Sequence, residues 1–169
     1  MHRINLTDKN NDYAIFTPAL STFYSNYVSR QRADGNYVPE ERIPAKFENG
    51  VEGLNFLNAD QGYFTYKYAL YSAGHAELDM TKAVDKEGMI HDRDHENTIL
   101  IGDSGGFQIS KGVWQGQWLE PEGSDAKTDA MRGKVLNWLE NTADYSMVLD
   151  IPTNGLNFID ESTGKPRCG

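Results

Sequence analysis

The stretch ILIGDSGGFQIS, residues 99–110, gives the first indication of how this chain folds. It begins with an apolar run and continues into an aspartate and a glycine-rich turn. An apolar run that ends in turn residues is typical of a strand covered on both faces. The stretch YSMVLD, residues 145–150, has the same form. Both predict buried parallel strands, with Asp103 and Asp150 at their carboxyl ends.

Extended and helical patterns alternate on both sides of these two stretches, which predicts an α/β fold built from parallel βαβ units. Ser21 is a candidate N-cap for the first helix. The last helix has an apolar stripe of Met131, Val135, Trp138 and Leu139. The pattern predicts strands at 13–20, 54–58, 98–102 and 145–150, helices at 21–31, 62–79 and 125–143, a loop at 34–50 and a polar connection at 81–97.

The composition limits which classes of protein this chain can belong to. The 169 residues are 38% hydrophobic, which is sufficient for a single globular domain over residues 1–169. Cys168 is the only cysteine, so neither a disulfide nor a cysteine-rich zinc site can form within the chain. No signal-peptide pattern or apolar run of membrane-spanning length occurs, so we expect a cytoplasmic protein without a membrane partner.

The net charge of −9 arises in residues 51–169, because acidic and basic side chains balance in residues 1–50. A protein that binds nucleic acid normally has a basic surface. Either the ligand of this chain is small, or a basic surface lies elsewhere on the molecule.

The letters GDSGG, residues 102–106, also surround the nucleophilic serine of trypsin-like proteases. That site needs a histidine base and an orienting carboxylate within a pair of β-barrels. The only histidine in a superficially suitable context is His75, and the alternating strands and helices do not fit β-barrels. The G-x-S-x-G elbow of other hydrolases also fails, because Ser104 lies one place early. We therefore reject the protease hypothesis.

With Phe107 and Gln108 included, the motif DSGGFQ after an apolar strand resembles the tRNA-guanine transglycosylase family, and YSMVLD resembles that family's next strand. The stretches FTPALSTFYSNYV (16–28) and LYSAGHAELD (70–79) look more like the phage and bacterial branch that inserts 7-deazaguanine derivatives into DNA. The resemblance covers residues 13–155. It implies a (β/α)8 barrel, for which about 250 residues is typical, and this chain would hold the N-terminal half.

The resemblance also implies a chemistry. Exchange of a base breaks one N-glycosidic bond and forms another through a covalent glycosyl-enzyme, with a group that moves a proton on the departing and incoming bases. The resemblance assigns this proton transfer to Asp103. Asp150 would accept hydrogen bonds from the N1–H and the exocyclic amine of a guanine-like base. The family's nucleophilic aspartate lies on a later strand, so we expect this chain alone to be inactive.

The remaining candidate residues surround these two aspartates. Glycines allow a backbone to approach a ligand closely, and an aromatic ring can stack on a flat base. The expected binding residues are Ser104, Gly105, Gly106 and Phe107, with Gln108 and Asn58 as further candidates; Asn58 would end the strand at 54–58 and orient Asp103.

Two stretches differ from the tRNA-specific pattern, IPTNG after Asp150 and PALSTFY at 18–24, and both favour DNA over tRNA as the substrate. The expected partners are therefore a nucleic acid and a free 7-deazaguanine base. The alternatives are a queuine- or archaeosine-type tRNA-guanine transglycosylase, or a non-catalytic purine-binding half-barrel. The family's zinc site would lie downstream, so we assign no metal or cofactor here. An unpaired strand edge would favour association between copies.

Two other clusters have both a structural and a functional interpretation. HDRDHE, residues 91–96, contains metal-binding residue types, but it lies in a polar connection and we expect a solvated loop. His75 is expected to cap or pack. Trp114 and Trp118 lie in the segment after the motif, as part of a packed loop or of a lid over the site.

Overall fold

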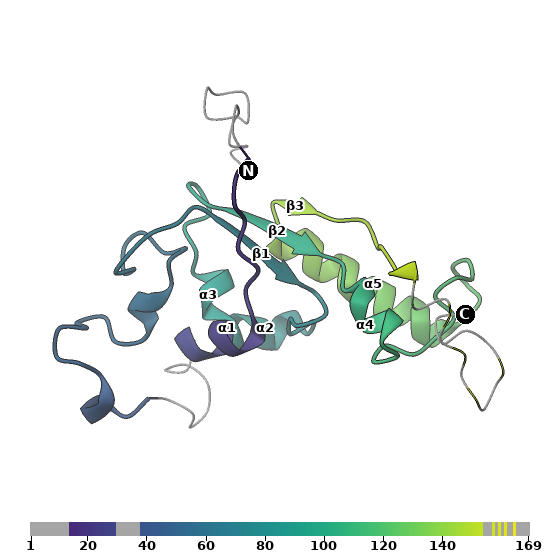
Figure 1. Cartoon of the computed structure of the whole chain (residues 1–169), viewed down its shortest axis with the longest axis horizontal. Helices are drawn as coiled ribbons and strands as arrows, with labels where there is room; N and C mark the ends of the chain where they lie inside the picture. Colours follow the sequence, from purple (N-terminus) through teal and green to yellow (C-terminus); the bar gives the residue numbers. More distant parts are fainter. Residues whose placement is uncertain are drawn as a thin grey trace.

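The computed structural model describes residues 14–29 and 38–153, together with residues 157, 159, 161 and 164. The parts of the predicted elements that fall on residues 13, 30–31 and 34–37 lie outside the described residues. Figure 1 shows the sheet with α1, α2 and α3 gathered near β1, while α5 runs alongside β2 and β3. In the described part of the chain no helix has the length and apolar character needed to cross a membrane.

Three parallel strands form the sheet, in the order β1 (Tyr68–Ser72), β2 (Ile99–Asp103) and β3 (Tyr145–Ser146). Their register pairs Tyr68 with Ile99 and Ser72 with Asp103, so β1 and β2 end side by side. Ala19 adds a parallel bridge to Leu70 on the other side of β1. Successive extended segments are therefore neighbours in space, as parallel βαβ units require. The complete (β/α)8 barrel stays a prediction.

The strand predicted at 54–58 is wrong. A 3-10 helix, η3 (Glu52–Leu54), includes the first of these residues, and turns follow it. The Asn55 side chain accepts a hydrogen bond from the backbone N–H of Leu57, and the Asn58 side chain accepts from Asp60 and Gln61. Asparagine side chains that bind nearby backbone groups in this way compete with strand pairing.

The helix predicted at 62–79 is also wrong, because β1 lies within it. The aromatic residues there fit a helical spacing, but the stretch YALYS alternates between half-buried and buried positions. Ala69 and Tyr71 are completely buried on one face of the strand. Pairing with β2 and packing of the aromatic rings outweigh the helical spacing, since strand preference depends on the tertiary setting.

The strand predicted at 145–150 is shorter and more exposed than expected. The paired part of β3 covers two residues, and one further bond joins the Met147 N–H to the Gly102 carbonyl at 2.8 Å. Val148 is 85% exposed, so burial on both faces is wrong for this segment within the described residues. The strand predicted at 13–20 is wrong for most of its described part, because only Ala19 forms a bridge to the sheet; Leu20 is buried and Phe16 is exposed. Both segments lie at the edges of the described sheet, where fewer elements cover them.

The helices predicted at 21–31 and 125–143 are confirmed as α1 (Thr22–Val28) and α5 (Ala126–Thr142). Ser21 caps α1 by accepting the N–H of Tyr24 at 3.1 Å, and Asp125 caps α5 in the same way through the N–H of Lys127. The polar connection at 81–97 contains two unpredicted short helices, α2 (Met80–Lys86) and α3 (Gly88–His91). Another, α4 (Gly106–Ser110), begins directly after the glycine turn.

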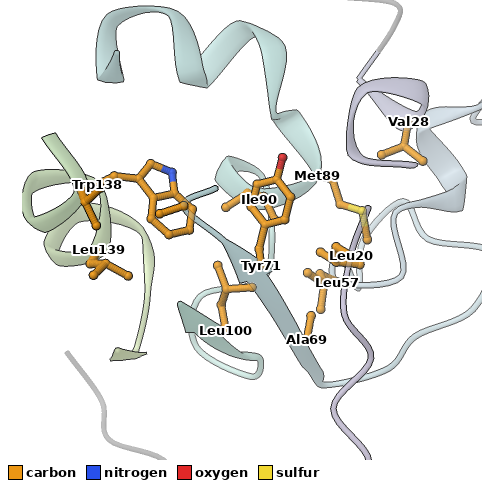
Figure 2. Packing of buried hydrophobic residues seen from close by; sticks show 12 residues of the cluster. Leu20, Val28, Leu57, Ala69, Tyr71, Met89, Ile90, Leu100, Trp138 and Leu139 are labelled. Atoms are coloured by element: carbon orange, nitrogen blue, oxygen red, sulfur yellow. The ribbon is translucent and has the colours of Figure 1, made fainter. Parts of the chain in front are cut away.

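The core lies where α5 and the N-terminal helices meet the sheet. Figure 2 shows the Tyr71 ring between the Trp138 side of α5 and the Met89 side of α3. The ring centroids of Tyr71 and Trp138 are 5.9 Å apart. Of the expected stripe on α5, Val135, Trp138 and Leu139 are buried, and Met131 is partly buried against the separate cluster of Ile109 and Trp118. The buried apolar residues of this cluster are Leu20, Val28, Leu57, Ala69, Tyr71, Ala73, Met89, Ile90, Leu100, Val135, Trp138 and Leu139.

A buried ion pair holds the amino-terminal side of the sheet. The Arg93 guanidinium lies 3.0 Å from the Asp144 carboxylate, and it also donates to both oxygens of Thr98. The same oxygen of Asp144 accepts the backbone N–H of Leu100 at 2.7 Å. Arg93 therefore ties the start of β2 to the residue that precedes β3. The carboxyl ends of the strands lie at the opposite end of the sheet from this ion pair, and parallel sheets usually form their sites at the carboxyl ends.

Candidate functional site

The Asp103 carboxylate occupies the carboxyl end of β2. Asp103 is opposite Ser72 in the ladder, and the Ser72 hydroxyl donates to its Oδ2 atom at 2.5 Å. The backbone N–H of Gly105 donates to the same oxygen at 3.3 Å. The side chain is half-buried. A carboxyl group in a defined orientation, still open to solvent, can accept a proton when it is ionised and donate one when it is protonated.

The turn after Asp103 needs a glycine at position 105 for reasons internal to the protein. Gly105 has a φ of 80°, in the left-handed region that side chains disfavour. A Cβ there would lie 2.7 Å from the Trp114 ring and 2.8 Å from the backbone nitrogen of Gly74. The expected role of Gly105 in ligand approach stays a prediction, beside this structural role.

Gly106 brings the two predicted strand ends together. A Cβ on Gly106 would overlap the carbonyl oxygen of Asp150. The Ser104 hydroxyl also donates to the Val148 carbonyl at 3.1 Å, 44 positions further along the chain. The motif and the segment after β3 are thus in direct contact through the backbone. The Asp150 residue itself is exposed.

Phe107 and Gln108 point to different surroundings. Phe107 is 56% exposed, and the Lys111 ammonium lies 5.3 Å from its ring centroid, which is within the range of a cation–π interaction. Its expected role in stacking on a base stays a prediction. The Gln108 carboxamide packs against Gly74, where a Cβ would overlap it. Gln108 therefore links α4 to the turn after β1.

Asn58 does not orient Asp103 through any contact in the described structure. Its side chain serves its own turn, and Ser72 is the side chain that contacts the Asp103 carboxylate. The sequence reasoning missed Ser72 because it placed the second strand at 54–58. No local pattern in YALYS marks Ser72, because both the alternation in burial and the pairing with Asp103 come from the tertiary structure.

An apolar groove of about 410 Å³ borders the motif on the other side. It runs between α5 and residues 146–149, and the motif reaches it only through Ser104. Trp114 and Trp118 also line it, with their ring centroids 6.2 Å apart, and Trp118 donates to the Trp114 carbonyl. Trp118 is buried, which supports a packed loop for this residue. A wider groove of about 780 Å³ lies apart from the motif, among residues 38–61.

Buried polar groups lie behind β1, away from Asp103. The Glu87 carboxylate accepts hydrogen bonds from the Tyr71 hydroxyl and the Glu77 N–H, both at 2.8 Å. Its Oε2 atom is buried without a hydrogen-bond partner in the described structure. Burial raises the pKa of Glu87, and burial followed by the charge of Glu87 raises the pKa of the Tyr71 phenol.

The residues of HDRDHE have structural contacts. Asp94 accepts the backbone N–H groups of Glu96 and Asn97, and hydrogen bonds from Asn97 lower its pKa. Arg93 forms the ion pair described above, and burial lowers the pKa of His91. Within the described residues, no group of three or more His, Cys, Asp or Glu side chains is arranged to hold a metal. His75 lies in the turn after β1, where its N–H donates to the Ser72 carbonyl.

No family model, curated protein or solved structure matches the chain.

Proposed function

We propose that this protein takes part in a transglycosylase reaction that exchanges guanine in DNA for a 7-deazaguanine base. The observation that carries the proposal is the DSGGFQ motif at the carboxyl end of a parallel strand, with Asp103 in a defined orientation. The chemistry needs a proton-transfer group at a strand end beside a flat binding surface. Asp103 and the exposed ring of Phe107 are suited to these two tasks.

In the proposed reaction Asp103 is the general acid/base. The departing guanine takes the electron pair of its glycosidic bond and a proton from the Asp103 carboxyl group, while C1′ of the sugar bonds to the nucleophilic aspartate that the resemblance places on a later strand. The incoming base then displaces that aspartate from C1′ and transfers its own ring N–H proton to the Asp103 carboxylate as the new bond forms. One complete exchange therefore returns Asp103 to its starting state.

Recognition of the base is assigned to Asp150 and Phe107. A carboxylate only accepts hydrogen bonds, so it suits the N1–H and 2-amino donors of a guanine-like edge. The contact between the Asp150 carbonyl and Gly106 places this residue next to the motif. Stacking on an aromatic ring contributes about 1–3 kcal/mol per base regardless of its identity. Asp150 would supply selectivity, and Phe107 affinity.

The first test replaces Asp103 with asparagine in the protein expressed from its complete reading frame. The assay follows incorporation of labelled guanine into double-stranded DNA and, in parallel, into tRNA. We expect Asp103→Asn to abolish exchange without changing the fold, because the substitution preserves shape and removes the group that carries the proton. Asp85→Asn, an exposed aspartate on α2, is the matched control and should exchange normally.

Exchange that persists in Asp103→Asn would refute the role of Asp103. Exchange into tRNA alone would favour the tRNA-specific alternative. If the wild-type protein bound guanine and exchanged no base, the non-catalytic purine-binding module would be the better description.

The second test separates recognition from stacking by competitive binding of guanine, 7-cyano-7-deazaguanine and adenine. We expect Asp150→Ala to lose the preference for guanine-like bases, because paired polar contacts carry that choice. Phe107→Ala should weaken all three bases by a similar factor. Loss of the guanine preference in Phe107→Ala but not in Asp150→Ala would overturn both assignments.

A further inference from the structure

We propose that Ser72 is a positioning residue for Asp103. Its hydrogen bond determines which of the two Asp103 carboxylate oxygens exchanges the proton with the base. This inference rests on the proposed function, because it concerns the same proton transfer. It adds a residue from a different strand, outside the DSGGFQ motif.

The hydrogen bonds of Ser72 fix the direction of its hydroxyl hydrogen. The backbone N–H of Gly74 donates to Ser72 Oγ at 3.2 Å. A hydroxyl that accepts at one lone pair remains free to donate its only hydrogen elsewhere, and here the Asp103 Oδ2 atom is 2.5 Å away. Ser72 is therefore the donor in a short hydrogen bond to a carboxylate, a kind of bond stronger than one between neutral groups.

Two donors in the described structure bind the same oxygen of the Asp103 side chain. Ser72 Oγ and the Gly105 N–H both bind Oδ2, one from β1 and one from the glycine turn. Oδ2 is consequently occupied within the described structure, and Oδ1 is the oxygen left to meet a base. In the proposed reaction Oδ1 gives its proton to the departing guanine and receives the proton of the incoming base.

The backbone holds the two residues at this distance. Ser72 and Asp103 are the last pair of the parallel ladder between β1 and β2. Directly beyond this pair, the N–H of Ala73 donates to the Asp103 carbonyl at 2.8 Å. The side chains of directly paired residues lie on the same face of a sheet. Ser72 therefore meets Asp103 without a loop rearrangement, which suits a group that sets geometry.

The test measures kcat and KM for base exchange in Ser72→Ala and Ser72→Thr, with Ser124→Ala, in an exposed loop, as the control. Loss of a hydrogen bond to a charged group should lower kcat by about 10- to 100-fold in Ser72→Ala. The KM for the free base should change by less than about 3-fold, because Ser72 touches the carboxylate and not the base. Ser72→Thr keeps the hydroxyl and should recover most of the rate.

A Ser72→Ala variant with wild-type kcat would overturn the inference and leave the proposed function intact, provided Asp103→Asn is inactive. A rise in KM with kcat unchanged would also overturn it. If wild-type protein exchanges no base, the proposed function and this inference fail together.

The urea midpoint checks folding of each variant. If Ser72→Ala is unfolded, Ser72→Cys takes its place, since a thiol has a similar shape and is a weak donor. The same loss of kcat is expected there, and a full rate would overturn the inference.

Discussion

Replacement of Gly106 by alanine tests the contact that joins the motif to the end of the next strand. Gly106 is the first residue of α4, and its φ does not lie in the left-handed region. Helix propensity alone would therefore favour alanine by up to about 1 kcal/mol. The structure predicts the opposite, because the added Cβ would overlap the Asp150 carbonyl oxygen and lie 2.6 Å from its carbonyl carbon.

The magnitude follows from what has to move. The obstructing atoms belong to the backbone, so they cannot rotate away as a flexible side chain would. Forcing one extra carbon into a packed contact costs about 1–3 kcal/mol. After the full favourable propensity is subtracted, we expect Gly106→Ala to destabilise the protein by up to about 2 kcal/mol. The displaced Asp150 should also reduce the binding of guanine.

Gly133→Ala provides a matched control for this measurement. Gly133 lies in the middle of α5, and nothing would lie within 4 Å of its Cβ. Alanine there should stabilise the protein by about 0.5–1 kcal/mol. The assay is urea unfolding followed by circular dichroism, at matched protein concentrations. A Gly106→Ala variant as stable as Gly133→Ala would refute the close approach of Asp150 to the motif.

Two further predictions concern groups outside the candidate site. Arg93→Met should lower the free energy of unfolding by about 2–4 kcal/mol in the same assay. This is less than the full cost of breaking a buried ion pair, because the Asp144 side chain is 27% exposed. Adding Asp144→Asn should recover part of the loss, and equal losses in the single and double variants would contradict the ion-pair explanation. Burial raises the pKa of Glu87 above its ordinary 4.5, so its contribution to stability is complete below about pH 4.5 and is lost as the pH rises through the folded-state pKa. Glu87→Gln should therefore gain stability relative to wild type as the pH rises from about 4.5. Urea unfolding at several pH values measures this. A difference in free energy of unfolding between variant and wild type that did not change with pH would contradict the prediction.

Local patterns in the sequence were sufficient for several elements. The apolar run of β2 ends at an aspartate and a glycine that accepts positive φ, so both the strand and its turn are encoded within ten residues. The stripe on α5 and the N-cap at Ser21 are equally local. In each case the physical cause, periodic burial or a hydrogen bond to a nearby N–H, acts over one or two turns of chain.

The placement of β1 depended on contacts that no local pattern contains. The aromatic residues around Tyr68 fit a helix as well as a strand, and pairing with β2, about thirty residues later in the register, favours the strand. Because the second strand was predicted at the wrong residues, Ser72 was not recognised as a site residue. The role of Ser72 follows from its pairing with Asp103 in the register of the sheet. The position of Gly106 against Asp150 has the same origin, since the two meet only after α5 returns the chain to the sheet.

The sequence pattern also did not predict that residues 147–149 are exposed. An apolar run states that a segment favours burial, but the neighbouring elements determine how much of it is covered. Periodicity and capping thus identified elements whose causes are short in range. Register, strand-edge position and the pairing of Ser72 with Asp103 arise from contacts between residues distant in the chain, and these form only when the whole sheet assembles.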